Sequence, residues 1–208
     1  MEVCVTTAQS DVGQQPLILH TRPMFEMSSE LFFDFCRTNR EWRIERNAQG
    51  EVLIMPPVGG ATSRGNVLLT TALNTWALQE RTGVVFDSSG GFELPNTATR
   101  SPDAAWVKRT RLAALTSDQK KRFLPLCPDF VVELRSPSDR LQVLQDKMQE
   151  YIDNGAQLGW LLDTVNRRVF VYRPGKDVEC LENQKTLAGD PELPGFVLDL
   201  TKIWEPDF

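Results

Sequence analysis

Two acidic residues occupy positions where a purely structural strand rarely places them. Asp103 follows Pro102 and opens the apolar stretch 104–107, and Glu133 lies near the end of the almost continuously apolar stretch 130–134. Fully buried carboxylates are rare unless they are paired or bound to a metal, because removing them from water costs several kcal/mol. Both positions therefore indicate carboxylates with a specific partner.

A lysine follows these acids inside a predicted helix. Lys147 has Leu144 and Tyr151 as neighbours on the helix surface, and Met148 belongs to the same apolar stripe. The lysine therefore borders the face that packs on the sheet. Two carboxylates at strand ends and a lysine facing the same sheet are typical of a site for a hard divalent cation, Mg²⁺ or Mn²⁺.

The small numbers of histidines and cysteines exclude other kinds of chemistry. The chain has one histidine, His20, so catalytic triads and histidine-based zinc sites are not expected. The four cysteines, Cys4, Cys36, Cys127 and Cys180, are far apart and form no CxxC pair, which removes zinc ribbons and thioredoxin-like motifs. We interpret them as small buried apolar residues.

The elements that must position the acids and the lysine follow from periodicity and turn residues. Ser28 and Ser29 offer an N-cap for a helix over 30–36, and a turn at 47–50 joins two strands into a hairpin. Ser138 or Asp139 can cap the helix that carries Lys147, and Gly155 ends it. The expected strands are 42–45, 52–55, 84–86, 104–107, 130–134, 158–163 and 169–172, and the longer helices are 62–79 and 140–154.

The order of these elements favours one mixed sheet. The 208 residues are 41% hydrophobic and 25% charged, which suits a single folded domain. We predict an N-terminal tail at 1–22 and one domain at 23–208, of the α/β (α+β) class: a central mixed β-sheet flanked by helices, with an N-terminal hairpin. No apolar run approaches the ~20 residues of a membrane span, and no secretory leader is visible, so a cytoplasmic protein is expected.

A family resemblance is carried by an ordered set of motifs. The chain resembles the Uma-two family of endonucleases, which belongs to the PD-(D/E)XK nuclease superfamily with its restriction endonuclease-like fold. The resemblance covers residues 25–205 and rests on SPDAAWV, PDFVVELRSPSDR, DKMQEY, LGWLLD and RVFVYRPG, preceded by WRIERNAQGEVLIMPP and GFELPNTATR.

The resemblance implies roles for individual residues. Asp103 and Glu133 match the metal-ligating acids, Lys147 matches the active-site lysine, and Glu45 matches an additional catalytic acid. Tyr151 completes the KxxxY pattern. Many family members carry a histidine where this chain reads SRGN at 63–66, so a role for that position does not transfer.

The superfamily's basic pattern places its lysine two residues after the second acid, where this chain has Arg135. An arginine stays protonated and cannot act as a base, although it can hold a phosphate. As in Uma-two-like proteins, the lysine would come instead from the following helix. Arg135, Arg100 and Tyr151 are the expected contacts to the substrate phosphate.

The implied activity is hydrolysis of DNA phosphodiester bonds by a water activated at Mg²⁺, with Mn²⁺ as a substitute. Asp103, Glu133 and the main-chain carbonyl of Leu134 would hold the metal, Lys147 would orient or deprotonate the water, and Glu45 could serve a second metal. Double-stranded DNA is the expected partner, membranes are not, and a homodimer would suit cutting two strands.

Different classes of function remain open at this point. A nuclease-fold binding or interaction module with negligible turnover would keep the same acids, and a hydrolase of another phosphoester is a third hypothesis. The charge is divided unevenly: residues 100–151 carry +3, whereas the whole chain carries −5 and its remainder −8. This distribution is compatible with DNA binding near the acids.

Structural roles compete with the catalytic ones. Asp103 could simply begin a strand after a proline. Glu133 could pair with Arg135 or with the arginine at position 140. Lys147 could extend along its helix to solvent, and Glu45 could lie on the polar face of an exposed hairpin.

Overall fold

A computed structural model describes residues 16–22 and 24–207, so the first fifteen residues of the predicted tail lie outside the described residues. The helices are α1 (Ser29–Thr38), α2 (Gly60–Glu80), α3 (Arg109–Ala113), α4 (Leu141–Asp153), α5 (Thr201–Trp204) and the 3-10 helix η1 (Gln119–Lys121). The strands are β1 (Leu17–Leu19), β2 (Arg43–Arg46), β3 (Val52–Met55), β4 (Gly83–Asp87), β5 (Phe92–Glu93), β6 (Thr99–Arg100), β7 (Ala104–Lys108), β8 (Phe130–Arg135), β9 (Leu158–Asp163), β10 (Arg168–Tyr172), β11 (Glu179–Glu182), β12 (Thr186–Ala188) and β13 (Val197–Asp199).

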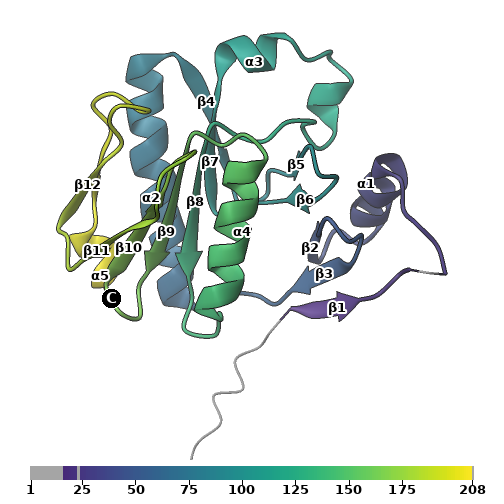
Figure 1. Cartoon of the computed structure of the whole chain (residues 1–208), viewed down its shortest axis with the longest axis horizontal. Coiled ribbons are helices and arrows are strands. Elements are labelled where there is room, and N and C mark those ends of the chain that lie inside the picture. Colours follow the sequence, from purple (N-terminus) through teal and green to yellow (C-terminus); the bar gives the residue numbers. More distant parts are fainter. Residues whose placement is uncertain (1–15, 23, 208) are drawn as a thin grey trace, which may run out of the picture.

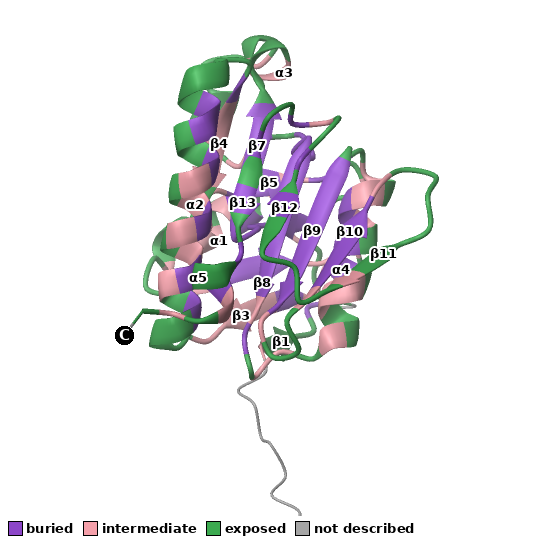
Figure 2. Ribbon diagram, turned by 90° about the vertical axis from the view of Figure 1, so that its left-hand side faces the viewer, coloured by how far each residue is buried: buried purple, intermediate pink, exposed green. Residues whose placement is uncertain are grey.

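The main sheet is mixed, as predicted. Its strand order is β11-β10-β9-β8-β7-β4, and β8 and β9 are parallel while the other neighbours are antiparallel. A parallel pair needs a crossover connection, and α4 provides it between β8 and β9. β8 therefore lies inside the sheet, with its first five residues buried, and Figure 2 shows the central strands as the most buried part of the fold.

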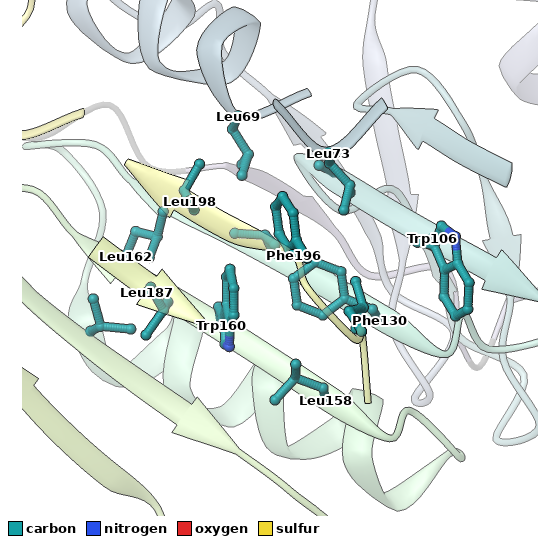
Figure 3. Close-up of a cluster of buried hydrophobic side chains, with 14 of the residues drawn as sticks. Leu69, Leu73, Trp106, Phe130, Leu158, Trp160, Leu162, Leu187, Phe196 and Leu198 are labelled. Atoms are coloured by element: carbon teal, nitrogen blue, oxygen red, sulfur yellow. The ribbon is translucent and has the colours of Figure 1, made fainter. Parts of the chain in front are cut away.

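One face of this sheet is covered by α2 together with the C-terminal segment (Figure 1). Leu69 and Leu73 of α2 point toward Phe196 and Leu198, which lie on the aromatic side chains of the sheet (Figure 3). The ring of Phe196 stacks on Trp160 at 5.6 Å and 14°. Aromatic packing therefore joins the C-terminal segment to the sheet.

The opposite face is covered by α4 (Figure 1). Met148 and Tyr151 are fully buried against it, which confirms the predicted apolar stripe. The prediction that Ser138 or Asp139 caps α4 was wrong. The N-cap residue is Arg140, and no side-chain hydrogen bond caps the helix. The Asp139 carboxylate accepts instead from the main-chain N–H and the hydroxyl of Ser136.

A second, five-stranded sheet has the order β1-β3-β2-β6-β5, and α1 packs beside it (Figure 1). It contains the predicted hairpin as β2 and β3. Ser28 caps α1 by accepting from the Leu31 N–H, as predicted. The segment interpreted as a tail contributes β1, which pairs with β3, so its residues 17–19 are a strand.

The longer helices and the predicted strands of the main sheet lie within two residues of their expected bounds, and the edge strand β11 was not predicted. Of the cysteines, Cys127 is buried, Cys36 is half-buried, Cys180 is exposed, and Cys4 lies outside the described residues. No helix of the described ranges 16–22 and 24–207 is long and apolar enough to cross a membrane.

The stacking of Phe196 on Trp160 predicts an effect of mutation on stability. Phe196→Ala should lower the free energy of unfolding by about 3–5 kcal/mol, because it leaves a cavity against Trp160. The neighbouring Val197 is 55% exposed, so Val197→Ala should change the value by less than about 0.5 kcal/mol. Urea unfolding of both variants measures the difference, and equal effects would contradict this role of Phe196.

Candidate active site

Asp103 and Glu133 are neighbours across two paired strands. Ala104 of β7 lies opposite Val132 of β8, and continuing this antiparallel register places Asp103 opposite Glu133. The main-chain N–H of Leu134 donates to Asp103 Oδ2 at 2.9 Å. The two acids that the sequence singled out therefore lie side by side, and both are buried, with 6% and 3% of their surface exposed.

Lys147 connects carboxylates from both sheets. Its Nζ lies 2.8 Å from Glu133 Oε1 on β8 and 3.0 Å from Glu45 Oε1 on β2. Lys147 is 9% exposed and Glu45 only 1%. The structural alternatives are therefore wrong for both residues: the lysine does not extend to solvent, and the hairpin acid does not lie on an exposed face.

Glu45 has further partners that hold it in place. Its Oε2 accepts from Arg100 at 3.2 Å, and its Oε1 accepts from the Ser101 N–H at 3.1 Å. Arg100 also donates to Glu150 of α4 at 2.6 Å. The result is a continuous chain of ion pairs that runs from β8 through the buried Lys147, Glu45 and Arg100 to the half-buried Glu150.

Asp103 is the acid that reaches a cleft. Its Oδ1 is 3.4 Å from both Arg43 Nη1 and Asn66 Nδ2, and all three residues line a cleft of about 620 Å³ between the β2–β3 hairpin and α2. Gly65 allows α2 to approach this closely, because a Cβ there would lie 2.6 Å from Leu134 Cδ2. Of the two acids, Asp103 is the one that lines this cleft.

The ion-pair chain shifts the pKa values of its members in different directions. Burial disfavours the charged form of Glu45, but Lys147, Arg100 and Arg43 outweigh it and lower its pKa to about 2. Burial also opposes the charge on Lys147, yet Glu133 and Glu45 raise its pKa above the usual value. Lys147 is therefore protonated and Glu45 is its ionised partner.

Glu133 responds in the opposite sense. Burial is the main cause, and the charges of Asp103 and Glu45 add to it, so its pKa rises to about 7 despite Lys147. The Tyr151 hydroxyl, whose own pKa is raised mainly by burial, donates to Glu133 Oε1 at 3.0 Å. The lysine and the tyrosine thus both act on the same oxygen and orient this carboxyl group.

The three residues expected to contact the substrate phosphate all have partners within the protein. Arg135 pairs with the fully buried Asp163 at 2.9 Å, which leaves Lys147 as the partner of Glu133 in place of Arg135. Arg100 is held by two carboxylates, and Tyr151 is fully buried. Their contact with phosphate stays a prediction, and it would require these pairs to open.

Some members of the site were not predicted. Arg43 holds Asp103, Asn66 contacts the same oxygen, and Glu150 anchors Arg100. The signal for Arg43 was its position two residues before Glu45 on one strand, which places both on the same face. Asn66 lies in the stretch 63–66 that lacks the family's histidine, and no sequence pattern distinguishes it.

The donor set fits a hard cation better than a soft one. Asp103 Oδ1 has only long contacts, and the two hydrogen bonds to Glu133 both fall on Oε1. Asn66 Oδ1 is buried and has no hydrogen-bond partner among the described residues. Within the described ranges of the chain, no group of three or more His, Cys, Asp or Glu could hold a metal, so the site offers the two carboxylates of Asp103 and Glu133. Mg²⁺ is commonly bound by one or two carboxylates and retains several waters, so this pair suits it.

The fold is of the restriction endonuclease-like class, and comparisons with known proteins agree with this class. A crystal structure described as a "putative nuclease belonging to DUF820" from Anabaena variabilis ATCC 29413 has a similar fold, with a TM-score of 0.68 and 20% sequence identity over 79% of this chain and 90% of that chain. The Uma2 family, described as "Putative restriction endonuclease", matches residues 29–201. The chain therefore belongs to the Uma2 family. No curated protein matches it.

The raised pKa of Glu133 predicts a pH effect on stability. A carboxyl group with a pKa of about 7 in the folded protein and about 4.5 when unfolded stabilises the fold below pH 4.5, and this contribution is lost as the pH rises through 7. Glu133→Gln cannot ionise. Wild type should lose stability as the pH rises from 4.5 to 7 in EDTA, and the variant should not. The free energy of unfolding of the variant minus that of wild type should therefore increase by a few kcal/mol over this range. Urea titrations across this range measure it, and a constant difference would be contrary to the assignment.

Proposed function

We propose that the protein is a metal-dependent endonuclease that hydrolyses phosphodiester bonds of DNA with Mg²⁺, or Mn²⁺ in its place. The observation that carries the proposal is the buried Lys147 Nζ 2.8 Å from Glu133, next to the acid that reaches the cleft. A structural ion pair would need one carboxylate. Here a lysine, two acids on adjacent strands and an open cleft lie together.

Asp103, Glu133 and the main-chain carbonyl of Leu134 would hold the cation. When bound, a divalent cation polarises the phosphate and lowers the pKa of a water molecule. The Leu134 N–H fixes Asp103 Oδ2, which leaves Oδ1 for the cleft. Lys147 and Tyr151 both contact Glu133 Oε1, so Oε2 would be the oxygen that holds the cation.

The protonated Lys147 supplies positive charge and does not act as a base. Its ammonium offsets the repulsion between Glu45 and Glu133 and stabilises charge that develops on the phosphate. Glu45 acts through this lysine, which it holds in position. Arg43 lines the cleft beside Asp103, and its guanidinium is the best-placed cation to bind the phosphate.

Cleavage of circular DNA tests the proposal. Purified protein should cut supercoiled plasmid or circular single-stranded DNA in Mg²⁺ or Mn²⁺, and EDTA should stop the reaction. Asp103→Asn and Lys147→Met should each lower the rate by about 10²–10³-fold, because each removes charge from the reacting centre. Gel electrophoresis of timed samples gives the rates.

Asp129→Asn is the matched control. Asp129 also follows a proline and is buried, but it pairs with Lys108 and Arg111 away from the acids of the site. This variant should cut like wild type once its folding is confirmed by circular dichroism. Cutting that survives EDTA or Asp103→Asn would refute the proposed site. Metal binding without any cutting would favour the binding-module alternative. The homodimer and the cytoplasmic location stay predictions.

A further inference from the structure

The cleft at Asp103 continues into a second hollow along α2. The second hollow has a volume of about 480 Å³ and shares Thr70, Thr71 and Asp87 with the first. It extends to Asn74 and Thr75 on the same helix. Together the two hollows form one groove, here called the α2 groove, that runs between α2 and the end of β4 and begins at the acid of the site.

Exposed apolar side chains gather where the α2 groove meets this acid. Trp42 is 53% exposed, Val58 is 46% exposed and Val67 is 55% exposed, and all three line the same hollow as Asp103. Pro56 and Pro57 extend this apolar wall. An exposed tryptophan in the same hollow as Asp103 offers a flat surface on which a planar ligand can stack.

The charge of the α2 groove is unusual for a protein that grips duplex DNA. Arg43 is the basic residue among its lining side chains, against the acids Glu41, Asp87 and Asp103. Arg64, at the same end of α2, is paired with Asp207 at 3.2 Å. Duplex DNA keeps its bases stacked inside, so its affinity depends on several Lys or Arg contacts to phosphates. The α2 groove does not offer such a row of cations.

We propose that the α2 groove binds an unpaired DNA strand, with a base stacked on Trp42 and the adjoining phosphate at Asp103. Unpaired bases can stack on aromatic side chains, which adds about 1–3 kcal/mol per base to the phosphate contact that Arg43 can make. The neutral hydroxyl and amide groups of Thr70, Thr71 and Asn74 can hydrogen-bond the rest of the strand. The inference rests on the proposed nuclease function and replaces the expected duplex substrate with single-stranded DNA.

Binding of labelled oligonucleotides tests this inference. Fluorescence anisotropy of the full chain, with Ca²⁺ in place of Mg²⁺, compares a single-stranded oligonucleotide with its duplex. The single strand should bind at least about 10-fold more tightly. Trp42→Ala should weaken that binding by about 5- to 150-fold, the range expected for the loss of one stacked base, while Trp42→Phe should keep most of it.

Phe25→Ala is the matched control, because Phe25 is an aromatic residue with a similar exposure of 50% outside the lining of the α2 groove. It should bind like wild type, and equal melting temperatures confirm that all variants are folded. Equal affinity for both DNA forms, or an unchanged Trp42→Ala variant, would overturn the inference.

The inference and the proposed function can fail separately. Metal-dependent cutting that requires Asp103, but shows no strand preference and no effect of Trp42, would leave the nuclease standing and refute the single-strand inference. Trp42-dependent binding of the single strand without cutting of either DNA form would support the inference about the α2 groove and remove the nuclease.

Discussion

The ammonium group of Lys147 lies between carboxylates that come from two different sheets, and the site depends on this contact. Glu133 belongs to the main sheet and Glu45 to the five-stranded sheet, while the lysine comes from the crossover helix α4. Buried carboxylates are stable only when a cation compensates them. The same contact therefore neutralises the interior and fixes the hairpin sheet against the strands that carry the acids. Arg100 repeats the arrangement between Glu45 and Glu150.

Sharing one lysine between two acids has a chemical consequence. Glu45, which also has Arg100, stays ionised, whereas burial and neighbouring carboxylates raise the pKa of Glu133 to about 7. The cluster thus contains one carboxyl group that gives up a proton when positive charge arrives. In the proposed nuclease, a cation held by Asp103 and Glu133 would displace that proton.

Sequence patterns within a single helix or strand predicted much of the fold and part of the site. The apolar stripe around Lys147 showed that this lysine borders the buried face, and acids in apolar strands marked Asp103 and Glu133. Contacts between distant elements left no such signal: Glu45 and Lys147 are 102 residues apart, and Arg100 and Glu150 are 50 apart. β5, β6, β12 and β13 are two or three residues long, too short for periodicity to reveal.

A double-mutant cycle on Glu45 and Lys147 tests most directly whether their contact organises the site. Glu45→Gln and Lys147→Met, alone and together, are compared by urea unfolding in EDTA. Each single change should cost about 3–5 kcal/mol because it leaves buried charge uncompensated. The double variant should be more stable than the sum of the two losses predicts, by more than about 1 kcal/mol. Losses that add within about 0.5 kcal/mol would contradict the account, since the two residues would then act independently.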